Sequence, residues 1–356
     1  MLNLMKKHSI RNAILVLILL LIVSSAAYGM TRYRSIKNAV NSSFNASGVT
    51  KERDVNKQLA GKKPISILLL GTDTGALGRS YKGRTDSMMV VTLNPTTNKT
   101  TITSVPRDTA VTIPGFASQS PSKINAAYAW GQAKTTIGTV QKMLNIPIDF
   151  YALINMGGME KVIDQVGGVD VTPTLGFTYE GYTFKKGVKT HMNGKKALAY
   201  SRMRYDDPDN DYGRQKRQRT VLMALVKKSG SISTLLNQSF ISSLTKQTQT
   251  DLTFDDLTSL AQNYRSATKN LKETHLQGTG KELNDQSMEV MKKSELQRVT
   301  NFIRNGLSLP SKKTGSIAIF NNASAKDKHR GSRSISNPDD IDSSAATTES
   351  GSGLGY

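Results

Sequence analysis

The chain has 356 residues, a length that suggests two domains or one large α/β domain with appendages. It carries 48 Lys and Arg against 27 Asp and Glu, and the formal charge of +21 indicates an anionic partner such as nucleic acid, a phosphate-rich polymer or anionic lipid. The absence of cysteine excludes disulfides, thiolate nucleophiles and Cys-based zinc sites. Four scattered histidines argue against a Ser-His-Asp triad or a multi-histidine metal site.

The N-terminus contains an uncharged apolar run over residues 13–30, preceded by several basic residues. A helix of that length measures roughly 27 Å, close to the thickness of a hydrocarbon core. We predict a cytoplasmic tail over 1–12 and a retained single-pass transmembrane helix over 13–30; a cleaved signal peptide, with the mature chain starting near Tyr28, is the alternative. This favours a cell-membrane protein with its C-terminal bulk outside the cell, where nucleic acid is not an expected partner.

The rest of the chain divides into three segments by composition. Residues 31–63 are polar and basic and are interpreted as a linker. Residues 64–310 alternate short apolar strands with helical patterns, which predicts one α/β domain. Residues 311–356 contain few large apolar side chains and are predicted to form a mostly disordered polar tail, with a last strand as an option at 316–320.

The domain pattern predicts five strands and six helices. In chain order, strands are expected at 65–70, 88–93, 100–105, 151–154 and 169–172, and helices at 125–144, 159–166, 195–201, 213–228, 253–270 and 294–305. Capping patterns at Thr253 and Ser294 open the last two helices.

Charged residues gather around the first strands. Asp73 and Arg79 follow the first strand, and Arg84 and Asp86 precede the second. An acid at the carboxyl end of a buried strand lies where α/β sheets commonly bind ligands. The alternatives are a turn or cap role for Asp73 and an exposed strand edge for the other pair.

A third cluster, Arg107 and Asp108, follows the third strand, which ends at Pro106 because proline cannot donate a sheet hydrogen bond. We expect both residues to lie beside Asp73, with a surface salt bridge as the alternative.

The fourth and densest cluster follows the helix at 195–201. It contains Arg202, Arg204, Asp211, Arg214, Arg217 and Gln218. The last three are spaced i, i+3, i+4, which places them on one helix face, next to an apolar stripe of Val221, Leu222 and Leu225. A solvated charged face is the alternative.

These clusters use arginine, although most basic residues of the chain are lysines. Arginine binds phosphate oxygens bidentately. Two separated acids with several arginines suit a pyrophosphate site with a divalent metal, in which carboxylates hold Mg²⁺ or Mn²⁺ and guanidiniums neutralise the remaining charge.

In this order the motifs resemble the LytR-CpsA-Psr family of bacterial cell-wall proteins. The motifs follow the expected cytoplasmic tail and single membrane anchor in the chain. They are LLLGTD, GRTDSMMVVTLNP, TSVPRDT, SKINAAYAWG, GGVDV and ALAYSRMRYDDPDNDYGRQKRQ. The resemblance implies a central mixed β-sheet flanked by helices, with an apolar groove for a polyprenyl chain. It also implies a phosphotransferase that moves a glycopolymer, such as wall teichoic acid or a capsular polysaccharide, from polyprenyl pyrophosphate to peptidoglycan.

The resemblance also implies site residues. Asp73 and Asp86 match the metal-associated acids. The pyrophosphate-binding set is Arg79, Arg84, Arg107, Arg202, Arg204, Arg214, Arg217 and Gln218, and the catalytic set is Asp73, Asp86, Arg107, Arg202 and Asp211. Asp108 is expected to support Arg107, while Lys123 and Asn125 fit either ligand contact or a helix start. One departure is Gly75, where many members have arginine; Arg79 is expected to substitute for it.

Two other functions stay open. The first is a hydrolase acting on the same polyprenyl pyrophosphate, with water in place of the sugar acceptor. The second is a non-enzymatic protein, either a polyanion-binding anchor or an envelope regulator.

Overall fold

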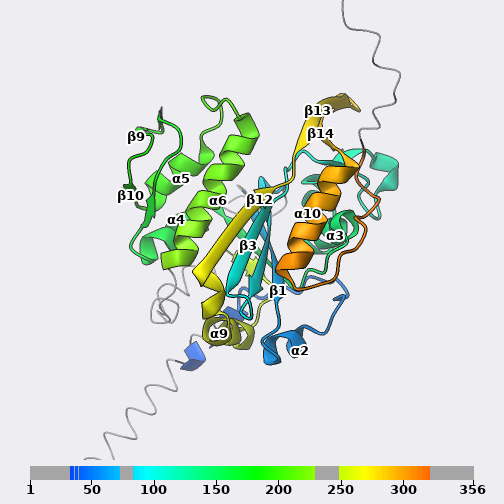
Figure 1. Cartoon of the computed structure of the whole chain (residues 1–356), viewed down its shortest axis with the longest axis horizontal. Coiled ribbons are helices and arrows are strands. Elements are labelled where there is room, and N and C mark those ends of the chain that lie inside the picture. The colour runs from blue at the N-terminus through cyan, green and yellow to red at the C-terminus, as the bar shows by residue number, and fades with distance from the viewer. Residues whose placement is uncertain (1–32, 36, 39, 73–82, 229–247, 321–356) are drawn as a thin grey trace, which may run out of the picture. The chain divides into compact units, whose positions relative to one another are not determined.

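A computed structural model of the chain describes residues 33–35, 37–38, 40–72, 83–228 and 248–320, which belong to one compact unit (Figure 1). The predicted tail and span over 1–30 lie outside the described residues, as do Asp73, Arg79 and residues 321–356. Over the described ranges, no helix is both long and apolar enough to cross a bilayer.

A mixed β-sheet forms the centre of the unit, with six strands in the described part of the chain. Their order is β11 (Thr248–Thr250), β6 (Phe150–Asn155), β1 (Ile65–Thr72), β2 (Ser87–Asn94), β3 (Lys99–Ser104) and β12 (Asn270–His275). β2 runs antiparallel to both β1 and β3, whereas β6 is parallel to β1 and β12 is parallel to β3. The carboxyl ends of β1, β3, β6 and β12 therefore meet at one edge, together with the amino end of β2.

Both faces of the sheet are apolar, because the strands carry hydrophobic residues at successive positions. Leu68, Leu70 and Val90 point to one face and pack against α3 (Ala126–Leu144) and α10 (Lys293–Gly306). Leu69 and Met89 alternate with them and point to the other face.

In the described part of the chain, five helices cover this second face. Toward the carboxyl edge it meets α4 (Met156–Gln165), α5 (Gly194–Arg202) and α6 (Asn210–Lys228), seen on the left of Figure 1. Toward the opposite edge it is covered by α2 (Val55–Ala60) and α9 (Phe254–Asn263).

Small antiparallel pairs surround this core. They are β7 (Val169–Val171) with β10 (Thr190–Met192), the hairpin β8 (Phe177–Tyr179) with β9 (Tyr182–Phe184), β4 (Ala110–Val111) with β5 (Ser122–Lys123), and the hairpin β13 (Gly278–Leu283) with β14 (Gln286–Met291). Short 3₁₀ helices lie at Ala117–Gln119 and Arg265–Lys269.

The predicted strands and helices are present with small shifts at their ends, with three differences. The capping box expected at Ser294 is wrong: the N-cap of α10 is Lys292, which makes no side-chain cap hydrogen bond. α3 is interrupted at Gly131 and Gln132, whose backbone angles are not helical. The helix expected over 253–270 is wrong in its second half: α9 ends at Asn263, and β12 begins at Asn270 and pairs with Lys99. β12 was not predicted because its sequence is mostly polar and lacks regular apolar alternation. Such a sequence is tolerated because β12 is a half-exposed edge strand.

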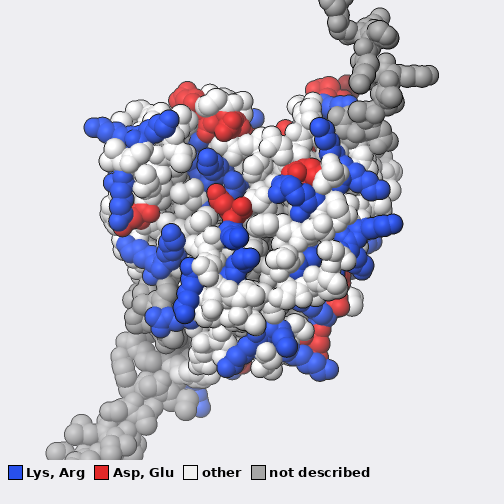
Figure 2. Space-filling view, viewed as in Figure 1, with Lys and Arg blue, Asp and Glu red and all other residues white. Residues whose placement is uncertain are grey.

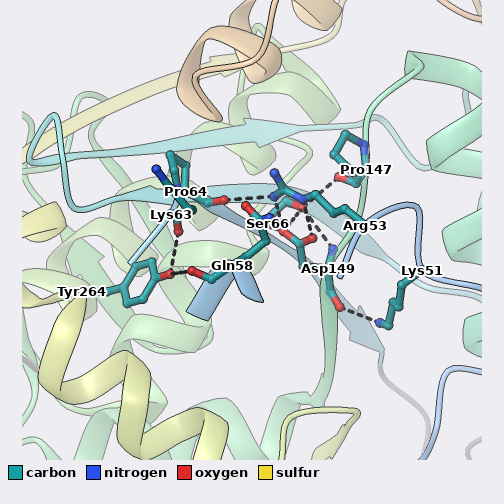
Figure 3. Close-up of polar contacts among 9 residues, drawn as sticks. All are labelled: Lys51, Arg53, Gln58, Lys63, Pro64, Ser66, Pro147, Asp149 and Tyr264. Carbon is teal, nitrogen blue, oxygen red and sulfur yellow. Dashed lines mark hydrogen bonds and ion pairs between the residues drawn. The ribbon is translucent and has the colours of Figure 1, made fainter. Parts of the chain in front are cut away.

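Residues 40–63 pack against the domain, so the folded unit starts before residue 64, and a linker is the wrong description of them. Leu59 is buried with Ile65 and Ile67. Ahead of α2, the Arg53 guanidinium forms an ion pair with the buried carboxylate of Asp149, which also accepts a hydrogen bond of 2.7 Å from the backbone N–H of Ser66 (Figure 3).

The folded unit also extends beyond the expected end of the domain. The backbone N–H of Thr112 donates to the carbonyl of Ile317, and isolated bridges join Ala318 to Val111 and Phe320 to Met291. The apolar stretch at 316–320 is thus part of the fold, as isolated bridges rather than a full strand.

Candidate active site

Asp86 and Arg107 meet at the carboxyl edge of the sheet. Asp86 directly precedes β2, and its backbone N–H donates to the carbonyl of Gly71 at 2.8 Å, which places it beside the end of β1. Arg107 leaves the end of β3 after Pro106, and its Nη1 atom lies 2.5 Å from Oδ1 of Asp86. Both side chains are half-buried, so the pair is shielded from water without being closed to a ligand.

Asp108 and Lys123 extend this ion pair. Asp108 Oδ2 lies 3.6 Å from Nε of Arg107, and Asp108 Oδ1 lies 2.8 Å from Nζ of Lys123. Asp108 thus supports Arg107, as expected. Lys123 pairs with the other carboxylate oxygen of Asp108 and so balances its charge. Asn125, the N-cap residue of α3, makes no side-chain cap hydrogen bond.

The first turns of α6 bring a second guanidinium to the same place. Arg214 Nη2 lies 2.5 Å from Oδ1 of Asp211 and donates to the main-chain carbonyl of Asp86 at 3.4 Å. Burial is the main cause that lowers the pKa of Arg214; Asp211 opposes this, and the neighbouring cation of Arg107 adds to it. The two guanidiniums thus lie close together in a half-buried site, where each also pairs with a carboxylate. Donors that these pairs leave free can bind an anion.

Unsatisfied hydrogen-bond donors on these two arginines also indicate a site for an anion. Among the described residues, the buried Nε atoms of Arg107 and Arg214 have no hydrogen-bond partner. Buried donors are nearly always satisfied in folded proteins, and an unsatisfied one calls for a ligand or water. Phosphate oxygens are suitable acceptors for both groups.

Two other predicted arginines, Arg84 and Arg202, lie apart from this ion pair, whereas Arg204 lies close enough to Arg214 for its charge to help lower the pKa of Arg214. Arg84 is exposed. Arg204 lies over the ring of Tyr205, with its guanidinium carbon 5.8 Å from the ring centroid. Arg202, at the end of α5, lies 3.4 Å from Glu180 in the turn of the β8–β9 hairpin, and no described contact joins it to Asp86 or Arg107.

Arg217 corrects the expectation that three residues of α6 share one ligand-binding face. Its side chain is only 4% exposed and forms an ion pair with Asp207. It also donates to the main-chain carbonyls of Tyr200 and Met203 and lies over the ring of Phe177. Because its donors are directed to interior groups, Arg217 joins α6 to the end of α5 instead of facing a ligand.

An apolar groove of about 270 Å³ lies between the sheet and helices α4, α5 and α6. Its floor includes Leu69, Met89 and Ile154, and its wall includes the stripe of Val221, Leu222 and Leu225. Gln218 and Ser87 also line it; Ser87 follows Asp86, and Gln218 lies one turn after Arg214. The apolar groove therefore leads to the charged cluster of Asp86, Arg107, Asp211 and Arg214.

The structure adds two residues that sequence reasoning missed. The Tyr212 hydroxyl donates to Oε2 of Glu289 at 2.9 Å and accepts from the backbone N–H of Gly278 at 2.8 Å. Burial is the main cause that raises the pKa of Glu289, with Asp108 and Asp211 adding to it against the Tyr212 hydrogen bond. Tyr212 was missed because the charged residues on either side of it define the motif. Glu289 was missed because the sequence of its hairpin shows no apolar periodicity that predicts a strand.

Comparison with known proteins identifies the family. The family model named LytR_cpsA_psr matches residues 29–305, which is most of the chain. This chain belongs to the LytR-CpsA-Psr family.

Curated relatives in the LytR-CpsA-Psr family match over nearly their whole length. A polyisoprenyl-teichoic acid–peptidoglycan teichoic acid transferase, TagU, of Enterococcus faecalis is 40% identical over 293 residues, covering 82% of this chain and 95% of the relative. The Bacillus subtilis protein of the same name is 35% identical over 303 residues, covering 85% and 97%.

Solved structures show the same fold. A Streptococcus agalactiae protein of 35% identity superposes with a TM-score of 0.67, covering 76% of this chain and 96% of that protein. TagT bound to LI-WTA has 28% identity and a TM-score of 0.59, covering 73% and 94%. The central mixed sheet flanked by helices is thereby confirmed.

The LytR-CpsA-Psr resemblance implies a divalent metal, and the donor chemistry of Asp86 fits one. Within the described ranges no three acidic or histidine side chains converge as a metal site, and Asp73 lies outside those ranges. Mg²⁺ commonly takes only one or two protein carboxylates together with substrate phosphates and water. The carboxylate of Asp86 is therefore suited to be one such ligand.

Proposed function

We propose that this protein is a membrane-anchored phosphotransferase. It transfers a glycopolymer, such as wall teichoic acid or another wall polysaccharide, from polyprenyl pyrophosphate to peptidoglycan. The relatives named as polyisoprenyl-teichoic acid–peptidoglycan teichoic acid transferases support this assignment.

One observation carries the proposal: the apolar groove adjoins the cluster of Asp86, Arg107, Asp211 and Arg214. A polyprenyl pyrophosphate has the matching shape, a long hydrocarbon chain attached to a compact multivalent anion. Burial of hydrocarbon contributes about 25 cal/mol per Å², so the tail supplies much of the affinity. The arginines then hold the pyrophosphate in register for the reaction.

The chemistry follows from the same residues. An acceptor hydroxyl of peptidoglycan attacks the sugar-linked phosphorus, and polyprenyl phosphate leaves. Phosphoryl transfer needs mainly positioning and charge stabilisation, which the guanidiniums of Arg107 and Arg214 supply beside the reacting phosphate. A Mg²⁺ or Mn²⁺ ion held by Asp86 and Asp73 would neutralise further phosphate charge.

The anchor belongs to this proposal as well. A span over residues 13–30 with a cytoplasmic tail places the domain outside the cell, where peptidoglycan is found. A reporter fused after Arg34 that works only when exported is expected to be active. Activity there of a reporter that works only in the cytoplasm would contradict the orientation.

The decisive experiment incubates the full chain with labelled lipid-linked polymer and peptidoglycan oligomers. We expect a phosphodiester between polymer and oligomer, with release of polyprenyl phosphate. Free phosphorylated polymer with no conjugate would identify the hydrolase. Binding without turnover, unchanged by Asp86→Ala, would identify a polyanion-binding anchor, because removal of an acid does not weaken binding to a polyanion.

A further inference from the structure

A second cavity lies on the other side of α6. It measures about 800 Å³ and is bounded by the first turns of α6, the end of β12 and the β13–β14 hairpin. Figure 2 shows this face hollowed between α6 and the hairpin, with acidic and basic side chains close together. We call it the polar cleft.

The lining of the polar cleft differs from that of the apolar groove. It mixes donors and acceptors, including Lys216, Arg219, Glu273, His275 and Gln277. Tyr205, next to the cleft-lining Arg204, is 86% exposed. Donors and acceptors beside an exposed aromatic ring suit the hydroxyls and the apolar faces of a glycan. The mainly polar lining is poorly suited to a polyprenyl chain.

Helix α6 separates the two cavities. Tyr212, Lys216 and Arg219 are spaced i, i+4, i+7 and face the polar cleft. The residues that line the apolar groove, from Gln218 to Leu225, occupy the opposite side of the helix. Two molecules bound in these cavities approach each other only at the start of α6.

The charged cluster stands at that meeting point. Asp108 and Asp211 line the polar cleft and also pair with Arg107 and Arg214, respectively. A glycan in the cleft is thus presented to a pyrophosphate held by the two guanidiniums.

Glu289 is held at the same junction. Its backbone N–H donates to the main-chain carbonyl of Asp108 at 2.8 Å, and Tyr212 fixes Oε2 of its carboxylate. No hydrogen bond to Oε1 is found in the described part of the chain, so this oxygen can receive a ligand hydroxyl. The titratable groups around it are Tyr212 and Asp211 of α6, Asp108 after β3 and His275 of β12.

We propose that the polar cleft binds the acceptor glycan and that Glu289 takes the proton from the attacking hydroxyl. This inference rests on the proposed function. The hydroxyl oxygen forms a new bond to the sugar-linked phosphorus, and its proton passes to the Glu289 carboxylate. The bond from that phosphorus to the polyprenyl phosphate breaks, and its electron pair leaves with polyprenyl phosphate. The raised pKa of Glu289 improves it as a base near neutral pH.

The first test compares Glu289→Gln with Glu282→Gln, a matched change at an exposed glutamate on the same hairpin. Loss of a general base is expected to lower kcat about a hundredfold or more, with a much smaller change in the KM for peptidoglycan oligomers. The acid limb of the wild-type kcat–pH profile is expected to disappear in Glu289→Gln. Unchanged kcat or an unchanged acid limb would overturn the role of Glu289.

The second test blocks the polar cleft with Ser287→Trp, at an exposed position of its lining. We expect at least a tenfold rise in the KM for peptidoglycan oligomers, with unchanged affinity for the lipid-linked donor. A loss of donor affinity instead would assign the cleft to the donor polymer and overturn the inference. Wild-type protein that binds donor but never forms conjugate would refute the proposed function itself, which keeps the two failures distinct.

Discussion

The side chains of Arg107 and Asp86 lie 2.5 Å apart although they follow and precede different strands. Antiparallel pairing of β2 with both β1 and β3 places the start of β2 next to the end of β3. The same edge receives α6, whose Arg214 reaches the main chain of Asp86. Asp86 therefore joins the sheet, through Arg107, to the helix that borders both cavities, through Arg214.

Replacement of Arg107 tests this relationship. A charge-assisted hydrogen bond to phosphate contributes about 1.5–3 kcal/mol, so Arg107→Ala should weaken donor binding roughly ten- to hundredfold. Arg107→Lys should recover only part of the loss, because lysine lacks the planar fork. Titration with lipid-linked donor measures the effect, with the exposed Arg265 at the opposite edge of the sheet as control. An equal loss in Arg265→Ala would show that only bulk charge matters.

Arg217 should behave differently from Arg107. Arg217→Ala leaves Asp207 buried without its cation, and removal of one partner of a buried ion pair typically costs about 3–5 kcal/mol of folding free energy. Denaturant unfolding of Arg217→Ala and Arg107→Ala compares the two sites. We expect the larger loss of stability in Arg217→Ala. If Arg217→Ala instead unfolded like the wild type and lost most of its donor affinity, Arg217 would have to contact the ligand.

The apolar groove should make affinity depend on tail length. Each buried methylene contributes about 0.8 kcal/mol, so donors with fewer isoprene units should bind progressively more weakly. Leu222→Asp should flatten this dependence, whereas Thr220→Asp, directed away from the groove on the same helix, should not. Affinities are compared below the aggregation limit of each donor. Equal affinity across all tail lengths would leave only a head-group site.

Turnover should depend on a divalent metal. Chelation should abolish transfer, and Mg²⁺ or Mn²⁺ should restore it in the wild type but not in Asp86→Asn. Asp285→Asn, at an exposed turn with positive φ that asparagine tolerates, serves as the matched control. Calorimetric titration of the metal in the presence of donor gives a second measurement. Full activity after exhaustive chelation would remove the metal from the mechanism.

The contact of Arg53 with Asp149, drawn in Figure 3, should contribute to folding stability without affecting turnover. Asp149 bonds to Ser66 near the start of β1, whereas Asp86 bonds to Gly71 near its end. Arg53→Ala leaves the Asp149 carboxylate, whose side chain is 1% exposed, without its cation. We expect a loss of about 3–5 kcal/mol in unfolding free energy. Lys57→Ala, which breaks the exposed pair with Asp54, should cost much less, because water screens the charges of an exposed pair. Similar losses in both variants would contradict this assignment.

Local patterns were sufficient for much of the fold. The apolar runs of β1 and β2, the capping box at Thr253 and the amphipathic pattern of α10 depend on neighbours within one or two turns. The order of the motifs was also sufficient to identify the family, and the match of the family model to residues 29–305 confirms it. Edge strand β12 and the β13–β14 hairpin have no comparable pattern, since their half-exposed positions accept polar residues on both faces.

Side-chain roles needed the tertiary structure. In sequence, Arg214 and Arg217 belong to one charged motif, yet one reaches the sheet edge and the other is buried against Asp207. Glu289 and Tyr212 lie 77 positions apart and meet only because the β13–β14 hairpin folds over the start of α6. The sequence by itself determined the element order, the family and the chemical type of the site, because these follow from short-range patterns. The tertiary structure decided which charges face a ligand, because burial and pairing depend on segments that are distant in the chain.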